Sequence, residues 1–221
     1  MRLLAPSVLS ADFLHLADDI ESVNTLGDII HLDVMDGALV PNISFGFPII
    51  EAIAKIARKP LDIHLMIENP WNYFERFAAA AGKGGMVSFH LEAAKRAGKD
   101  PAQLLRQLKS LGVQAGIVIN PDIPVEELFP FVEEADYMLI MSVFAGFGGQ
   151  KFIPETLGRI SALKEEISKN GAACLIEVDG GVDASNADEL ASCGAEIFVA
   201  GSSFFKAADR KALSDAIKGR N

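Results

Sequence analysis

Cysteine is scarce in this sequence: the 221 residues contain two, Cys174 and Cys193. Their number and spacing argue against a disulfide framework or a zinc ribbon as the basis of the fold. Long apolar runs are missing too, since no stretch approaches the roughly 20 apolar residues that a membrane span requires. The apolar run at residues 3–9 is short and is broken by Pro6 and Ser7, which argues against a secretory signal. We therefore expect a cytoplasmic protein that contacts no membrane.

Positive charge is also in short supply, with 20 Lys and Arg against 30 Asp and Glu and a net charge of −10 at pH 7. Phosphate backbones of nucleic acids are bound by Lys and Arg, so this balance argues against nucleic acid as the main partner. A small phosphorylated ligand stays possible, because backbone N–H groups can hold a phosphate.

One alternation runs along the whole chain: short apolar runs are separated by longer segments with helical spacing. The apolar runs predict eight strands, at residues 3–9, 29–34, 61–66, 86–90, 114–119, 137–142, 173–178 and 197–200. The intervening segments predict eight helices, at residues 13–23, 48–56, 70–80, 101–110, 124–132, 156–168, 185–192 and 209–217. Proline at several helix starts and glycine at several helix ends support these boundaries, the glycines being Gly27, Gly82, Gly112, Gly171 and Gly194.

Eight βα units in 221 residues are typical of a (β/α)8 TIM barrel. The runs are continuously apolar, as expected for parallel strands covered on both faces. A doubly wound open sheet is the alternative that the pattern alone leaves open. Because no linker, charge block or low-complexity segment interrupts the series, we predict a single catalytic barrel domain over residues 1–221.

Ionisable side chains gather where the predicted strands end. Residues two apart on a strand share a face, so His31 and Asp33 point the same way, and His64 and Asp179 end two further strands. A lone histidine in an apolar strand is more often a core residue, but burying four ionisable groups without a partner costs several kcal/mol. Imidazole and carboxylate together suit zinc, iron, manganese or cobalt. The sequence therefore predicts one divalent metal ion at these four side chains.

Three glycine-rich loops predict a phosphate site. They follow the sixth, seventh and eighth predicted strands, at residues 145–150, 179–181 and 200–203. Each could be a tight turn alone, but barrels often bind a phosphate beside their last strands. Glycine lets backbone N–H groups approach an anion closely, so the three loops together favour a phosphorylated substrate.

The motifs of the chain resemble those of the ribulose-phosphate 3-epimerase family, in order and over nearly the whole length. They are APSVLSAD (5–12), HLDVMDG (31–37), VPN (40–42), DIHLM (62–66), MSV (141–143), GFGGQ (146–150), EVDGG (177–181) and AGS (200–202).

This resemblance implies that His31, Asp33, His64 and Asp179 bind the metal, with zinc the first choice, and that Asp33 and Asp179 are the acid/base pair. It implies a phosphorylated ketose as the partner molecule, a place in the pentose phosphate pathway, and self-association into a homo-oligomer. The residues that it implies as substrate contacts are Ser7, His64, Gly146, Phe147, Gly148, Gly149, Gly180, Gly181, Gly201 and Ser202, with Met35, Met66 and Met141 in support.

The implied reaction is epimerisation at C3, from D-ribulose 5-phosphate to D-xylulose 5-phosphate. A proton is removed beside the C2 ketone and returned on the other face, which requires two groups and a metal-stabilised enediolate. A six-carbon substrate such as D-allulose 6-phosphate would use the same residues and is the main alternative. A metal-independent decarboxylase or lyase needs a lysine at a strand end, which this sequence does not offer. A non-catalytic sugar-phosphate sensor is a more distant alternative.

One position departs from the family. Proline usually precedes the glycine loop, whereas this chain has Phe144 and Ala145, and we expect the loop to be looser for it. Among nearby residues we expect His90 to be structural, and Asp36 and Asn42 to support the site from behind.

Overall fold

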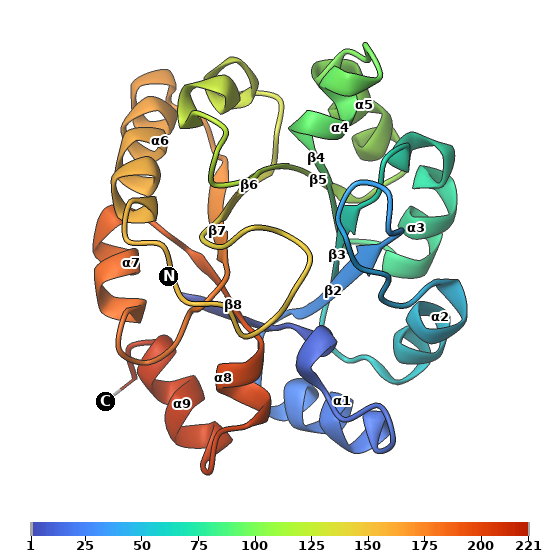
Figure 1. The fold of residues 1–221 in the computed structure, drawn as a ribbon, viewed down its shortest axis with the longest axis vertical. Helices are drawn as coiled ribbons and strands as arrows, with labels where there is room; N and C mark the ends of the chain where they lie inside the picture. The colour runs from blue at the N-terminus through green and yellow to red at the C-terminus, as the bar shows by residue number, and fades with distance from the viewer. Residues whose placement is uncertain (1, 221) are drawn as a thin grey trace.

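The computed structural model describes residues 2–220 (Figure 1). Eight parallel strands form one sheet in the order β1-β8-β7-β6-β5-β4-β3-β2, and an isolated parallel bridge between Ser7 and His31 joins its two ends. The helices lie around the outside of this ring (Figure 1). The predicted (β/α)8 barrel is therefore confirmed, and the alternative of a doubly wound open sheet is excluded. The strands are β1 (Leu3–Pro6), β2 (Ile30–Met35), β3 (Leu61–Met66), β4 (Met86–His90), β5 (Gln114–Ile119), β6 (Tyr137–Met141), β7 (Leu175–Asp179) and β8 (Ile197–Ala200).

The helices follow the predicted positions, with two additions. The α-helices are α1 (Leu16–Leu26), α2 (Phe47–Ile56), α3 (Phe74–Ala81), α4 (Leu91–Arg96), α5 (Pro101–Ser110), α6 (Thr156–Asn170), α7 (Ala187–Cys193), α8 (Ser202–Phe205) and α9 (Arg210–Ile217). Short 3-10 helices are η1 (Val8–Ser10), η2 (Pro70–Asn72) and η3 (Val125–Phe131). The short helices α4 and α8 were not predicted, because each follows directly on a strand end and lacks an apolar stripe of its own.

Two local predictions are wrong. The first strand ends at Pro6 rather than Leu9, because the Ser7 carbonyl accepts from Ser10 N and the chain turns into η1. The segment predicted as a helix at 124–132 is a 3-10 helix, since Pro130 inside it cannot donate an α-helical hydrogen bond. Gly27 is the C-cap of α1, as predicted, and its backbone is extended with φ −85°.

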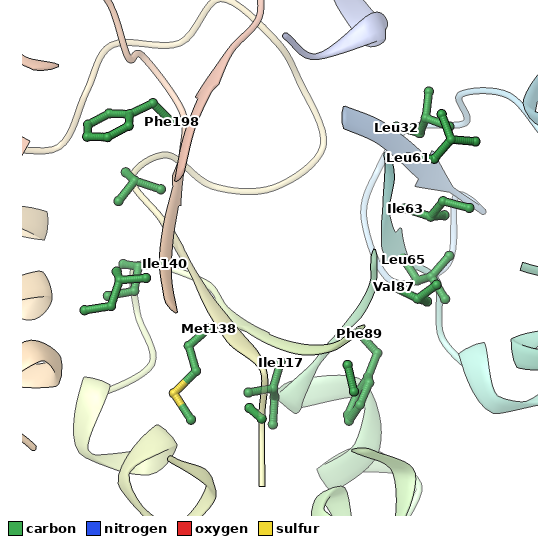
Figure 2. Packing of buried hydrophobic residues seen from close by; sticks show 14 of the residues in the cluster. Leu32, Leu61, Ile63, Leu65, Val87, Phe89, Ile117, Met138, Ile140 and Phe198 are labelled. Carbon is green, nitrogen blue, oxygen red and sulfur yellow. The ribbon is translucent and has the colours of Figure 1, made fainter. Parts of the chain in front are cut away.

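The two faces of the strands have different partners. On β3, Leu61, Ile63 and Leu65 point out toward the helices and join the main apolar core (Figure 2). The alternate residues Asp62, His64 and Met66 are turned to the barrel interior, as the period of two requires. This alternation is what places ionisable groups inside the barrel without breaking the outer core.

The barrel interior is filled by a separate apolar cluster that includes Ala5, Met86, Tyr137 and Ile197. Tyr137 fits because Gly116 on the neighbouring strand has no side chain: a Cβ there would lie 2.3 Å from the tyrosine Cζ. The filled interior confines functional groups to the mouth at the carboxyl ends of the strands. Within residues 2–220, no helix combines the length and apolarity needed to cross a membrane.

Candidate active site

Three buried side chains from β2 and β3 meet inside the mouth of the barrel. Asp33 Oδ1 lies 3.3 Å from His31 Nε2 and 3.2 Å from His64 Nδ1. The other oxygen of Asp33 accepts a 2.5 Å hydrogen bond from the Ser7 hydroxyl. The strand register pairs Asp33 directly with His64, so the predicted spacing of these residues brings them together.

Asp179 completes the cluster from β7, which β8 and β1 separate from β2 around the barrel. One potential ligand atom from each of His31, Asp33, His64 and Asp179 lies within 4.8 Å of every other. Tetrahedral ligands at 2.0–2.1 Å from a zinc ion are about 3.3 Å apart, which matches the two distances measured from Asp33. Both the donor types and their spacing therefore fit a divalent transition metal ion.

The pKa values of the two carboxyl groups of this cluster are shifted in opposite directions. Burial disfavours the charge on Asp33, but the imidazoles of His31 and His64 outweigh it and hold the Asp33 pKa well below its usual range. Burial and the neighbouring Asp33 charge raise the pKa of Asp179 to about 7. Paired carboxyl groups with separated pKa values are what acid/base catalysis requires.

The pKa values of the two imidazoles are also shifted in opposite directions. Burial lowers the pKa of His64 to about 4, so this ring is neutral. Burial also opposes a charge on His31, but Asp33 and Asp62 on either side raise its pKa well above the ordinary value. His31 Nε2 therefore carries a proton, and a cation that binds this nitrogen would displace the proton.

A second layer of buried polar groups supports His31 from below. Asp62 Oδ2 lies 2.6 Å from His31 Nδ1, and its other oxygen accepts from the Tyr137 hydroxyl at 2.8 Å. Glu177 Oε1 lies 3.4 Å from the same His31 nitrogen, and burial together with the Asp62 charge raises the Glu177 pKa well above its usual value. Asp62 thus orients His31 with Nε2 toward Asp33, as a carboxylate behind a metal-binding histidine does.

Above this cluster lies a cavity of about 620 Å³ that opens at the mouth. Of the predicted substrate contacts and supporting residues, His64 is buried beneath the cavity and the others line it, namely Ser7, Gly146, Phe147, Gly148, Gly149, Gly180, Gly181, Gly201, Ser202, Met35, Met66 and Met141. Asp33 and Asp179 reach the same cavity, whereas His31 is buried with His64. The predicted acids therefore face a ligand space, and the two histidines lie behind them.

Two of the glycines are required by close approaches of the chain. A Cβ at Gly180 would lie 2.5 Å from Val143, and one at Gly181 would lie 2.6 Å from Phe152 N. Both have positive φ, 118° and 63°, which other residues rarely adopt. The loops after β6 and β7 are thereby packed together along one side of the cavity.

The loop after β6 is tied to its neighbours by side-chain amides. Asn42 Nδ2 donates to the Gly146 carbonyl at 2.6 Å, which supports the predicted role of Asn42. Ala145 donates its backbone N–H to Asn120 Oδ1 at 3.0 Å, a bond that the proline usual in this position could not make. The departure from the family pattern therefore replaces one restraint on the loop with another. Asp36 accepts from the backbone of Ala38, Leu39 and Glu68 and shapes the loop after β2.

A family model described as the Ribulose-phosphate 3 epimerase family matches residues 3–205, which is nearly the whole barrel. The chain belongs to this family. The ribulose-phosphate 3-epimerase of Helicobacter pylori is 42% identical over 215 residues, or 97% of this chain and 96% of its own. The ribulose-phosphate 3-epimerase of Synechocystis is 43% identical over 217 residues, which cover 98% of this chain and 91% of its own. The epimerase resemblance of the motifs is confirmed, and the chain is an isomerase rather than a non-catalytic sensor.

Solved structures with little sequence similarity share the epimerase fold. KGPDC from Streptococcus mutans has a TM-score of 0.70 at 10% identity and covers 100% of this chain and 97% of its own. Tryptophan synthase from Mycobacterium tuberculosis has a TM-score of 0.65 at 16% identity, and the match covers 99% of this chain and 92% of that chain. These similarities concern the barrel alone.

Sequence reasoning missed several polar residues of the epimerase site. Lys151 and Lys206 line the cavity beside the glycine loops. Asp62 and Glu177 lie in the second layer, where the period of two could have found them, because they share a strand face with His64 and Asp179. His90 was expected to be structural, and it lies 2.9 Å from His64.

Proposed function

We propose that this epimerase interconverts D-ribulose 5-phosphate and D-xylulose 5-phosphate with one divalent metal ion held by His31, Asp33, His64 and Asp179. The observation that carries the proposal is the convergence of four ligand-type atoms within 4.8 Å at the base of a 620 Å³ cavity. Zinc is the ion that the donor set favours, with iron, manganese or cobalt as alternatives.

Asp33 and Asp179 are the proposed proton carriers. They enter the cavity from β2 and β7, so each can serve one face of a planar intermediate. Asp33 with its low pKa and Asp179 with a pKa of about 7 can act as the base and acid pair, and the roles exchange when the reaction runs backward. The bound cation would supply stabilisation of the negative charge that develops on the sugar oxygens. Ser7 fixes the orientation of the Asp33 carboxylate through its hydroxyl.

The phosphate is proposed to bind on the side of the cavity formed by the loops after β6, β7 and β8. Glycine there exposes backbone N–H groups, and Lys206 adds a positive charge on the same side. Met35, Met66 and Met141 line the same cavity and would pack on the carbon chain of the sugar.

The proposed setting is the cytoplasm, which the cytoplasmic isoform of the rice ribulose-phosphate 3-epimerase supports, at 40% identity over 219 residues. The chain would serve the pentose phosphate pathway there. The net charge of −10 keeps nucleic acid an unfavourable partner. Self-association into a homo-oligomer stays a prediction, to be tested by sedimentation.

Metal analysis followed by activity assays tests the proposal. Protein purified without chelator is expected to contain about one transition metal ion per chain. Chelation should abolish epimerisation, and the removed ion should restore it. D-ribulose 5-phosphate and D-allulose 6-phosphate are then compared by kcat/KM. Full activity in the metal-stripped protein would refute the metal, and a higher kcat/KM with the hexose phosphate would refute the pentose.

A further inference from the structure

His64 has a buried neighbour that the proposed reaction leaves unused. His64 Nδ1 faces Asp33, and its other nitrogen, Nε2, lies 2.9 Å from His90 Nε2. Both rings are fully buried. Their planes differ by only 17° and their centroids are 5.1 Å apart, so the two rings lie edge to edge with the nitrogens aimed at each other. One of these nitrogens must therefore carry a proton and the other must accept it.

Beyond His90 lie one acceptor and one donor. Glu92 Oε2 is 3.6 Å from His90 Nδ1, is buried, and has no hydrogen-bond partner among the described residues. Asn120 Nδ2 is 3.5 Å from the same His90 nitrogen. The orientation of this amide is fixed, because Asn120 Oδ1 accepts from Ala145 N while Nδ2 donates to Glu92 Oε1. His90 Nδ1 can therefore either accept from Asn120 or donate to Glu92.

Two arrangements of protons are compatible with this chain of contacts, and the second requires the 3.6 Å contact between His90 Nδ1 and Glu92 Oε2 to shorten into a hydrogen bond. In the first, Asn120 Nδ2 donates to His90 Nδ1, His90 Nε2 donates to His64, and His64 Nδ1 donates to Asp33. In the second, each ring carries its proton on the other nitrogen. His64 Nδ1 has a free lone pair, His64 Nε2 donates to His90 Nε2, and His90 Nδ1 donates to Glu92 Oε2 instead of accepting from Asn120. Each arrangement has one proton on each ring, so the change between them adds and releases none.

Only the second arrangement leaves His64 Nδ1 able to bind a metal ion, because a ligating nitrogen cannot carry a proton. We propose that His90, held by Glu92 and Asn120, is a positioning residue that switches tautomer when the metal binds and thereby holds His64 in its ligating form. This inference rests on the metal site of the proposed function and assigns Glu92 Oε2 as the acceptor of the second arrangement.

The relay makes the two metal-site histidines different from each other. His31 is oriented by Asp62, whose charged carboxylate lies 2.6 Å away and fixes one tautomer. His64 is backed by a second imidazole whose Nε2 can accept or donate a hydrogen bond, so the tautomer of His64 depends on what occupies Nδ1. Removing the acceptor at residue 90 would leave His64 Nε2–H buried without a partner in the metal-bound form.

The test combines histidine NMR with metal affinity in the full-length chain. The four histidines of wild-type protein are labelled with 15N, and ring protonation is read without and with zinc. Zinc is expected to move the ring proton of His64 from Nδ1 to Nε2 and that of His90 from Nε2 to Nδ1. Zinc affinity is measured by chelator competition for His90→Phe, which cannot accept, His90→Gln, whose amide oxygen can, and Ser88→Ala, a buried control on the same strand.

We expect His90→Phe to weaken zinc binding about 10–100-fold, His90→Gln to recover most of the loss, and Ser88→Ala to bind as wild type. The relay is refuted if wild-type protein binds zinc through His64 while the tautomer of His90 stays the same. It is equally refuted if His90→Phe binds zinc as tightly as Ser88→Ala. If His90→Phe does not fold, the wild-type spectra and His90→Gln decide alone. A wild-type chain that binds no zinc, iron, manganese or cobalt would instead overturn the proposed metal site itself.

Discussion

The two sides of the barrel mouth offer polar groups in different ways. The β2–β4 side presents buried side chains, with His31, Asp33, His64 and His90 linked by contacts of 3.3 Å or less. The β6–β8 side presents glycine-rich backbone, and Asp179 is the acid that it adds to the cluster. A rigid layer of ionisable groups suits a metal and proton transfer, whereas exposed backbone suits a phosphate. Changes in the side chains of the first side and in Asp179 should therefore affect the chemical step, and changes in the glycine loops of the second side should affect binding.

The largest effect is expected on the side-chain side. Asp33→Asn removes a carboxylate that contacts both histidines, and kcat should fall by about 10²–10⁴. Asp18→Asn on the exposed face of α1 is the matched control and should leave kcat unchanged. Steady-state kinetics at saturating substrate, with metal content verified, provides the measurement. A variant at Asp33 with wild-type kcat would contradict the division between the two sides.

A smaller effect of a different kind is expected on the glycine side. A Cβ at Gly201 would lie 2.9 Å from Ser10 Oγ, so Gly201→Val should displace the loop after β8. KM should rise about tenfold, or 1.4 kcal/mol of binding, with kcat changed less. Gly158→Val on the exposed surface of α6 serves as the control, because nothing lies within 4 Å of a Cβ there. If kcat fell while KM held, the loop would be acting on the chemical step.

A third effect, on stability rather than on kinetics, depends on pH and tests the side-chain side. Burial opposes the charge on Glu92, but hydrogen bonds and the His90 ring lower its pKa to about 2, from an ordinary value of 4.5. Because the folded-state pKa is depressed, the ionised group stabilises the fold fully above pH 4.5, and this stabilisation is lost as pH falls toward 2. Glu92→Gln should therefore cost up to about 3 kcal/mol at neutral pH, and the cost should shrink in acid.

Urea denaturation at several pH values measures this difference in the free energy of unfolding, with the exposed Glu133→Gln as control. A cost that is independent of pH would mean that the Glu92 charge contributes nothing to the fold.

The side-chain side was largely predictable from sequence, because the period of two in β2 and β3 selects the inward face. The same rule points to Asp62 and Glu177, but their roles depend on distances across the closed barrel that no local pattern contains. The relay through His90 joins residues from β3, β4 and the end of β5, so it appears only when three strands are aligned.

The glycine side was predictable in outline and less so in detail. Glycine-rich loops after successive strands indicated the phosphate side, but the lysines of the cavity come from a loop end and from the end of α8, where sequence alone gives no direction. The hydrogen bond from Ala145 to Asn120 depends on a loop path that the missing proline alone could not reveal. Local chemistry was therefore easier to predict than the contacts between loops.

Solvent isotope exchange tests the central claim that Asp33 and Asp179 serve opposite faces of the substrate. In Asp33→Asn and Asp179→Asn variants with verified metal content, the remaining carboxylate can remove and return a proton on its own face only. Each variant should exchange the C3 proton of one epimer slowly and that of the other very little, and the preferred epimer should reverse between the two variants. Equal exchange from both epimers in both metal-loaded variants would contradict the two-face account.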